Sequence, residues 1–272
     1  MVNGIVATDL KEALIVRAQG NYTPYGGGTD LMIKSDRNAR YLFLHKVPEM
    51  KRIVEDDRYI RIGSSCTFTE VLQNPRIPQL LKEAVSQIAA PAIRNLGTIG
   101  GNIGNGSAKA DSALIFFVSD SLLRLASVRG ERVLPIKDFY LGRKKLALSE
   151  DELIVEVLMP KKGLDNYYYK KIGARDALAI SRVSFAALLE ISEGIIRNCA
   201  TAFGAVTEVV FRRPDFDALL IGKTLEEAKH QKDSYLAAYE KALVPIQGRI
   251  SAEYRKVVCM NLLKDFLEKN GI

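Results

Sequence analysis

Two glycine-rich segments carry the residue types and spacing that favour binding of a phosphate group. They are Gly26-Gly27-Gly28-Thr29-Asp30 and Thr98-Ile99-Gly100-Gly101-Asn102. Glycine has no Cβ, so its backbone N–H group approaches a ligand closely, and consecutive N–H groups form an anion nest. The first segment alone is equally typical of a tight turn, and it lacks the GxGxxG pattern of a dinucleotide fingerprint. Two such loops in one module predict a site that holds a pyrophosphate from both sides.

The second segment lies in a longer glycine-rich stretch, residues 94–107, in which five of 14 residues are glycine. So many glycines predict no stable regular element there. A third sequence, Gly222-Lys223-Thr224, has the end of a phosphate-binding loop, but Asp217 stands at the place of its first glycine. The sequence therefore predicts only the start of a helix at 222–224.

Cysteine and histidine are too dispersed for a metal site. The three cysteines are Cys66, Cys199 and Cys259, and the two histidines are His45 and His230. This spacing fits neither a disulfide framework nor a zinc or cysteine-bound iron–sulfur centre. We therefore expect no metal, and any redox chemistry requires an organic cofactor.

The net charge of +7 is spread along the chain, and its one concentrated run is Arg143-Lys144-Lys145. A nucleic-acid-binding protein concentrates its basic residues on one helix or face, so we expect no nucleic-acid partner. No apolar stretch approaches the roughly 20 residues of a membrane span. The N-terminus lacks the pattern of a secretory signal, and we expect a cytoplasmic protein.

The elements that must position the two loops mix helix and strand without the strict alternation of a doubly wound sheet, which permits an α+β fold. Apolar spacing predicts helices over 8–18, 77–90, from 111, 225–242 and from 251, and strands over 21–25, 41–44, 52–54, 59–63, 122–127, 152–158, 167–172, 183–191 and 195–203. Glu193-Gly194 predicts a hairpin turn. The last helix is expected to bury Tyr254, Val257, Val258, Leu262, Phe266 and Leu267 on one face. Pro160 to Gly163 is the best domain boundary.

The two loops resemble the paired FAD-binding loops of molybdenum hydroxylase flavoproteins, the xanthine dehydrogenase and carbon monoxide dehydrogenase medium-subunit family. The similar sequences are YGGGTDLM (25–32) and IRNLGTIGGNIGNGSAKADS (93–112). EDELIVEVLMP (150–160), KKIGARDALAISRVSFAALLE (170–190) and GAVTEVVFRRPDFDALLIGKTL (204–225) resemble further motifs of this family in the same order. Ala108 stands where the family often has proline, and Tyr25 where it often has a small residue.

The resemblance implies a fold and a domain organisation. Residues 1–160 would form a two-subdomain FAD-binding domain of the p-cresol methylhydroxylase (PCMH/VAO) type, with subdomains of about 1–55 and 56–160. Residues 161–272 would form an α+β C-terminal domain of the CO dehydrogenase flavoprotein type. The cofactor, FAD, would lie in the cleft between the two subdomains.

The resemblance also implies roles for individual residues. The first loop would hold the pyrophosphate and ribityl region with Tyr25, Gly26, Gly27, Gly28, Thr29, Asp30 and Leu31, and the second wall would consist of Thr98, Ile99, Gly100, Gly101, Asn102 and Asp111. Ile154 would pack on the isoalloxazine ring, although simple strand alternation also explains it. Lys171 would reach the carbonyl edge of the ring and tune the flavin, or lie on the surface beside Lys170. Tyr25 would stack near the flavin or pack elsewhere, and no catalytic residue is certain.

The implied function is that of an FAD-binding electron-transfer subunit of a molybdenum hydroxylase. Its partners would be a molybdopterin-binding catalytic subunit and a [2Fe–2S] subunit, with an electron acceptor such as NAD. One alternative is a self-sufficient FAD-dependent oxidase or reductase, for which the residues after Pro160 leave little room. The other is a non-catalytic nucleotide-binding regulatory module.

Overall fold

The computed structural model describes residues 3–34 and 38–272, and the chain divides into two compact units. The first unit consists of Met1–Ile77, Ile88–Ser107 and Asp120–Lys161, and the second of Pro78–Gln87, Ala108–Ser119 and Lys162–Ile272. Residues 78–87 and 108–119 therefore group with the C-terminal part, although the sequence places them in the domain 1–160. They do so because their helices, α3 (Gln79–Ser86) and α6 (Asp111–Val118), pack on the strands of the second unit.

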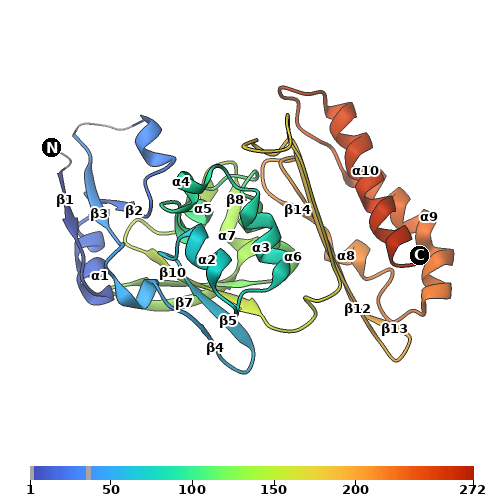
Figure 1. Ribbon diagram of the computed structural model, residues 1–272, viewed down its shortest axis with the longest axis horizontal. Helices are drawn as coiled ribbons and strands as arrows, with labels where there is room; N and C mark the ends of the chain where they lie inside the picture. The colour runs from blue at the N-terminus through green and yellow to red at the C-terminus, as the bar shows by residue number, and fades with distance from the viewer. Residues whose placement is uncertain (1–2, 35–37) are drawn as a thin grey trace. The chain divides into compact units, whose positions relative to one another are not determined.

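The first unit contains a small parallel sheet of strands β1 (Asn3–Val6), β3 (Arg40–Phe43) and β2 (Thr23–Tyr25), in that order (Figure 1). Helix α1 (Leu10–Ala18) begins where Asp9 accepts a hydrogen bond from the backbone N–H of Glu12, so the helix predicted over 8–18 is confirmed. Its buried Ala13 and Val16 share a core with Leu153 and Val155. This core joins the small sheet to the rest of the first unit.

The larger sheet of the first unit is antiparallel, in the order β4-β5-β10-β6-β7. Its strands are β4 (Ile53–Glu55), β5 (Tyr59–Gly63), β10 (Leu153–Pro160), β6 (Leu122–Ser127) and β7 (Gly130–Pro135). The central strand, β10, is buried from Leu153 to Met159. The remaining elements are helices α2 (Phe68–Gln73), α4 (Pro91–Arg94), α5 (Ile99–Gly104) and α7 (Ile136–Phe139), the 3-10 helices Leu31–Lys34 and Pro48–Met50, and the β8 (Tyr140–Gly142) and β9 (Lys145–Leu146) pair.

Helix α5 corrects the prediction that residues 94–107 hold no regular element. The side chain of Thr98 caps the helix by accepting from the N–H of Gly101 at 3.0 Å. The N–H groups of Ile99 and Gly100 donate to the carbonyls of Cys66 and Ser64 at 3.0 and 2.7 Å. These bonds to the preceding segment offset the conformational cost of glycine in a helix.

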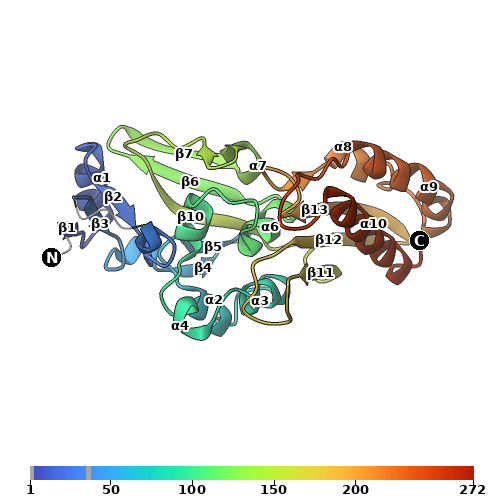
Figure 2. The same ribbon diagram turned by 90° about the horizontal axis from the view of Figure 1, so that it is seen from above.

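The second unit is a four-stranded antiparallel sheet with helices on both faces (Figure 2). Its strands, in spatial order, are β11 (Tyr167–Ile172), β12 (Val183–Ser192), β13 (Ile195–Gly204) and β14 (Phe211–Arg212). Helices α3 and α6 pack on one face and α10 (Ala252–Lys269) on the other, with α8 (Pro214–Asp217) and α9 (Leu225–Ala242) beside it. Glu193 and Gly194 join β12 to β13 with φ of +53° and +74°, which confirms the predicted hairpin turn.

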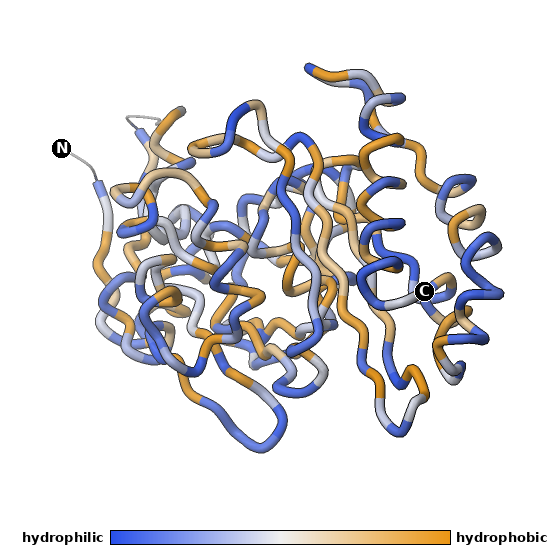
Figure 3. The backbone as a smooth tube through the Cα atoms, turned by 45° about the vertical axis from the view of Figure 1, so that its right-hand side comes forward, coloured by the Kyte–Doolittle hydropathy of each residue, from blue (hydrophilic) through white to orange (hydrophobic). Residues whose placement is uncertain are grey.

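The face of α10 that packs on the sheet differs partly from the prediction. Leu262, Phe266 and Leu267 are buried, but Tyr254 and Val257 are 47% and 54% exposed. Arg255, Cys259 and Leu263 are buried in addition, and these positions follow helical spacing more closely. Arg255 replaces an apolar residue in this stripe because its guanidinium donates to the carbonyls of Arg182 and Ala205. The tube of α10 alternates accordingly between apolar and polar residues (Figure 3).

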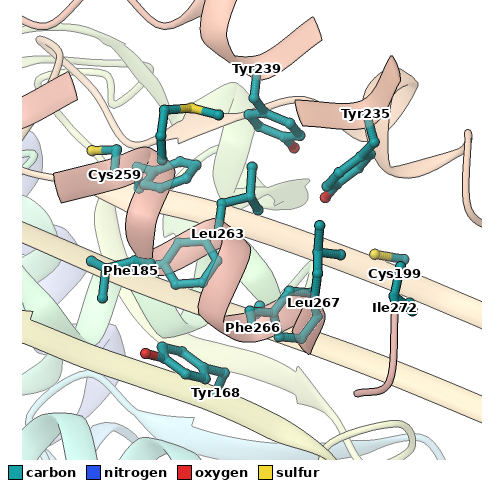
Figure 4. Packing of buried hydrophobic residues seen from close by; sticks show 14 of the residues in the cluster. Tyr168, Phe185, Cys199, Tyr235, Tyr239, Cys259, Leu263, Phe266, Leu267 and Ile272 are labelled. Atoms are coloured by element: carbon teal, nitrogen blue, oxygen red, sulfur yellow. The ribbon is translucent and has the colours of Figure 1, made fainter. Parts of the chain in front are cut away.

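Aromatic rings fill the core between the sheet and helices α9 and α10 (Figure 4). Phe185 and Phe203 lie on neighbouring strands with ring centroids 4.7 Å apart. Phe185 also contacts Phe266 of α10, and Phe203 contacts Tyr239 of α9, both edge-on or tilted. This core gives the second unit its own hydrophobic support.

Candidate functional site

The first unit contains a cavity of about 340 Å³, within the range of small-molecule and cofactor sites. Its lining comes from both sheets of the unit and from the two glycine-rich segments. The lining residues are Arg17, Thr23, Pro24, Gly26, Gly27, Gly28, Thr29, Asp30, Leu31, Leu44, Ser64, Ser65, Phe68, Gly97, Thr98, Gly100, Gly101, Asn102, Gly104, Asn105, Leu148, Glu152, Leu153 and Ile154.

The first glycine segment is a loop that begins where β2 ends at Tyr25. Within the described residues, no acceptor receives the backbone N–H groups of Gly26, Gly27, Gly28 and Thr29. Four consecutive residues that line the cavity thus have N–H groups available to an anion, as in an anion nest. The loop therefore supplies hydrogen-bond donors to a bound anion.

Two positions of this loop require glycine. A Cβ on Gly27 would lie 1.7 Å from the carbonyl oxygen of Leu96, so any side chain there would push the two segments apart. Gly28 has a φ of +70°, and its Cβ would lie 1.9 Å from the hydroxyl of Tyr25. The close approach to residues 96–97 joins the loop to the segment that precedes α5.

Helix α5 contributes space rather than free donors. The N–H groups of Ile99, Gly100 and Gly101 are all used within the protein, as described above. A Cβ on Gly101 would meet only the Oγ1 of Thr98 within 4 Å, at 2.9 Å, and one on Gly104 would meet only Ile154, at 3.7 Å. Gly101 and Gly104 therefore leave room at the cavity wall that a side chain would fill, whereas a Cβ on Gly100 would lie 2.5 Å from the Cβ of Ser64.

An apolar wall lies at the start of β10. Leu153 and Ile154 both line the cavity although they are neighbours in one strand. The pairing of β10 with β6 shifts register between Ile154 and Glu156, and such a bulge re-aims side chains. With Leu148 and Phe68 these residues form an apolar surface suited to a flat ring system.

The charged residues at the cavity are few. The guanidinium of Arg17 donates from Nε to the carbonyl of Glu152 at 3.3 Å and from Nη1 to the carbonyl of Tyr22 at 2.8 Å. Burial lowers the pKa of Arg17, and the carboxylates of Glu150 and Asp151 oppose that effect. The carboxylate of Glu152 binds Arg132 at 2.6 and 2.8 Å, which lowers the pKa of Glu152 to about 2.

Most of the predicted site residues line this one cavity: Gly26, Gly27, Gly28, Thr29, Asp30, Leu31, Thr98, Gly100, Gly101, Asn102 and Ile154. Tyr25 and Ile99 are not among the lining residues. The ring of Tyr25 packs 4.7 Å from that of Phe43, and Ile99 is buried.

Asp111 and Lys171 lie in the second unit, where they form a buried ion pair with Nζ and Oδ2 2.8 Å apart. Lys171 also donates to the carbonyl of Gln87 at 2.8 Å, and the hydroxyl of Ser181 donates to Asp111 at 2.6 Å. Burial raises the pKa of Asp111, while the bonds from Lys171 and Ser181 oppose the rise. Neither residue is among those that line the cavity.

The sequence prediction missed several lining residues, notably Arg17, Ser64, Phe68 and Glu152. Arg17 lies in a predicted helix, and one of its acceptors, Glu152, is 135 residues away in the chain. No local pattern marks such a residue. That Arg17 of α1 lines the cavity can be recognised only from the folded structure, in which both sheets contribute to the cavity.

Two classes of site are absent from the described residues. In residues 3–34 and 38–272, no three His, Cys, Asp or Glu side chains gather closely enough to hold a metal ion. No helix among the described residues has the length and apolarity needed to cross a lipid bilayer.

Comparisons with known proteins match both parts of the chain. Residues 1–162 match the family described as "FAD binding domain in molybdopterin dehydrogenase", and residues 167–270 match "CO dehydrogenase flavoprotein C-terminal domain". The chain is 31% identical to the xanthine dehydrogenase FAD-binding subunit of Escherichia coli O157:H7, over 89% of this chain and 85% of the relative. It is 31% identical to the nicotinate dehydrogenase FAD-subunit of Eubacterium barkeri, over 73% and 71%.

The fold has close counterparts among solved structures. A chain of the reconstituted CO dehydrogenase from Oligotropha carboxidovorans superposes with a TM-score of 0.89 at 22% identity, covering 98% of this chain and 96% of that chain. This likeness supports the predicted α+β fold with a two-subdomain FAD-binding architecture.

Proposed function

Because the chain belongs to the family of FAD-binding proteins of the molybdopterin dehydrogenases, we propose that it is the electron-transfer subunit of a molybdenum hydroxylase. FAD is its cofactor, and it is an oxidoreductase subunit. Its proposed partners are a molybdopterin-binding catalytic subunit and a [2Fe–2S] subunit, and its proposed electron acceptor is NAD. The names of its relatives, which are subunits of dehydrogenases, support this assignment.

One observation carries the proposal. The same cavity is lined by backbone N–H groups without an acceptor and by glycines that leave room for a ligand. The N–H groups of Gly26 to Thr29 are suited to the diphosphate of FAD, and Gly101 and Gly104 of α5 leave room in the same cavity. A phosphate-free ligand would have no need of four consecutive free donors. The residues present therefore fit FAD.

The residues of the chain bind and orient the cofactor, which supplies the redox chemistry when bound. Leu153 and Ile154 form the apolar wall against which a flat ring system would pack and from which water would be excluded. Lys171 stays a proposed flavin-tuning residue, because a cation near the ring favours the more negative, reduced flavin. Asp111 stays a proposed contributor through its ion pair with Lys171.

Titration of the purified, cofactor-free chain with FAD tests cofactor binding. We expect a yellow complex with an oxidised-flavin spectrum. Circular dichroism of the same sample shows whether the chain is folded. A folded chain without affinity for FAD would contradict the proposal.

Electron transfer needs a separate experiment. The FAD-loaded chain is mixed with NADH, and bleaching of the flavin is followed in a single turnover. We expect bleaching and NADH-dependent reduction of an artificial dye, but no hydroxylation of purines or other heterocycles. Co-expression with the genes adjacent to its own is expected to copurify a molybdopterin chain and an iron–sulfur chain, and hydroxylation by the isolated chain would overturn the assignment.

A further inference from the structure

The cavity of the first unit has one cationic side chain among its described lining residues, Arg17 of α1. The other charged lining residues are Asp30 and Glu152. The carboxylate of Glu152 is already engaged by Arg132. Arg17 is therefore the only lining side chain there that carries charge opposite to that of a diphosphate.

The guanidinium of Arg17 is held in place yet incompletely used. Nε and Nη1 donate to two backbone carbonyls, those of Glu152 and Tyr22. Within the described chain, Nη2 donates to no acceptor, and the carboxylates of Glu150 and Asp151 act on the guanidinium without a hydrogen bond to it. Glu150 and Asp151 offset part of the cost of burying this charge, and an anion bound at Nη2 would offset it further.

We propose that Arg17 binds the anionic diphosphate of the cofactor and so favours FAD over uncharged flavins. The inference rests on the proposed function and adds a binding residue to it. Two sets of donors would then share the diphosphate, the amides of Gly26 to Thr29 and the free edge of Arg17. The carbonyls of Tyr22 and Glu152 position that edge, because a guanidinium fixed at two nitrogens presents its remaining N–H groups in a set direction.

Arg94 of the first unit provides a matched control. Like Arg17 it is part-buried and donates to two backbone carbonyls, those of Ile88 and Ala89 at 2.8 and 2.7 Å. It is not among the lining residues. Arg94→Met therefore removes comparable hydrogen bonds without removing charge from the cavity.

The experiment measures the dissociation constants of FAD, ADP and riboflavin for the full chain and for Arg17→Met, Arg17→Gln and Arg94→Met. We expect the two Arg17 variants to bind FAD and ADP about 10- to 100-fold more weakly, as for loss of a hydrogen bond to a charged group. Riboflavin, which has no phosphate, is expected to bind unchanged. The salt dependence of FAD binding is expected to flatten in both Arg17 variants, because one charge pair has been removed.

Arg17→Gln keeps a hydrogen-bonding side chain. It therefore still tests the inference if Arg17→Met fails to fold. Wild-type affinity for ADP and FAD in Arg17→Gln would overturn the inference. Equal losses for riboflavin and FAD, or the same losses in Arg94→Met, would also overturn it, because they indicate a structural role. A wild-type chain that binds none of the three ligands would instead contradict the proposed function itself.

Discussion

The cavity of the first unit and the polar core of the second unit differ in whether their hydrogen-bond donors have acceptors within the protein. The cavity presents backbone N–H groups of glycine without acceptors, together with one incompletely used guanidinium. The polar core of the second unit, by contrast, surrounds the buried carboxylate of Asp217 with donors. Unused donors at a cavity wall await a ligand, whereas satisfied ones hold a fold together.

Five hydrogen bonds satisfy Asp217. Thr201 donates from its hydroxyl at 2.7 Å and from its backbone N–H at 3.1 Å, and Arg212 donates at 2.6 Å. The hydroxyls of Tyr235 and Tyr239 donate at 3.0 and 2.9 Å. Burial raises the pKa of Asp217 while Arg212 and Thr201 oppose the rise. The network joins β13, β14, α8 and α9, so its function is stability.

The largest expected effect comes from removing the central carboxylate of this network, that of Asp217. Asp217→Ala removes the carboxylate that Arg212 binds, and it takes the same acceptor from four further donors, two of Thr201 and the hydroxyls of Tyr235 and Tyr239. We expect the free energy of unfolding of the second unit to fall by about 3–5 kcal/mol, measured by urea unfolding and by hydrogen exchange of β13. Asp215→Ala, which removes an exposed carboxylate paired with Arg213, is the control and is expected to change little. Equal losses of stability in the two variants would contradict the stabilising role of the Asp217 network.

Lys171→Met tests the ion pair that the sequence assigns to the flavin. Both of its side chains are at most 7% exposed, so the variant leaves the carboxylate of Asp111 buried and unpaired. We expect a loss of about 3 kcal/mol in unfolding free energy, and slower single-turnover bleaching of the flavin by NADH at unchanged FAD affinity. Lys170→Met, at the exposed neighbouring position, is the control. Wild-type bleaching in Lys171→Met would remove its proposed role at the flavin and leave a purely structural pair.

Gly101→Val tests whether the glycine at 101 of α5 leaves room for FAD in the cavity. The valine side chain would occupy the cavity, and its Cβ would displace the cap formed by Thr98. We expect the FAD dissociation constant to rise by roughly 100-fold, equivalent to about 2.8 kcal/mol, with only about 1 kcal/mol lost in stability through the cap. Ala92→Val, a similar insertion at an exposed position of α4, is the control. Unchanged FAD affinity would show that this glycine serves the helix alone.

The smallest expected effect concerns acid stability of the first unit. The pKa of Glu152 is held at about 2 by Arg132, below its ordinary value of 4.5. The stabilisation is therefore present above pH 4.5 and is lost as the pH falls toward 2. Arg132→Met should lower stability at pH 7 by about 1 kcal/mol, since Arg132 is 45% exposed and partly screened, and should not lower it near pH 2. Melting temperatures between pH 7 and 2.5 check this, with Arg129→Met as control.

The sequence predicted the long helices and the strands with a clear periodic pattern, but it did not predict β1, β7, β8, β9 or β14. Strands 122–127 and 167–172 and helix 225–242 match the structure at both ends. The sequence predicted the loop at 26–30 as a binding segment because consecutive glycines leave their backbone N–H groups accessible to a ligand. The family resemblance then connected this loop with the segment at 98–102.

Tertiary hydrogen bonds explain what the sequence did not predict. Helix α5 forms despite its glycines because Cys66 and Ser64 accept from its first turn. The exposed Tyr254 and Val257 were placed in the core because apolar type alone does not fix which side of a helix faces the sheet. A hydrogen bond to the carbonyl of Glu152 holds the guanidinium of Arg17 at the cavity. No spacing rule links two residues so far apart in the chain.

The close approach of Gly27 to the carbonyl of Leu96 has a consequence for how the two glycine segments can change in evolution. A Cβ at Gly27 would overlap that backbone carbonyl oxygen, which every residue type at position 96 carries. A change of side chain at 96 therefore cannot compensate for a larger residue at 27. In a library that randomises both segments, functional variants should keep glycine at 27, whereas position 96, whose leucine is 58% exposed, should vary.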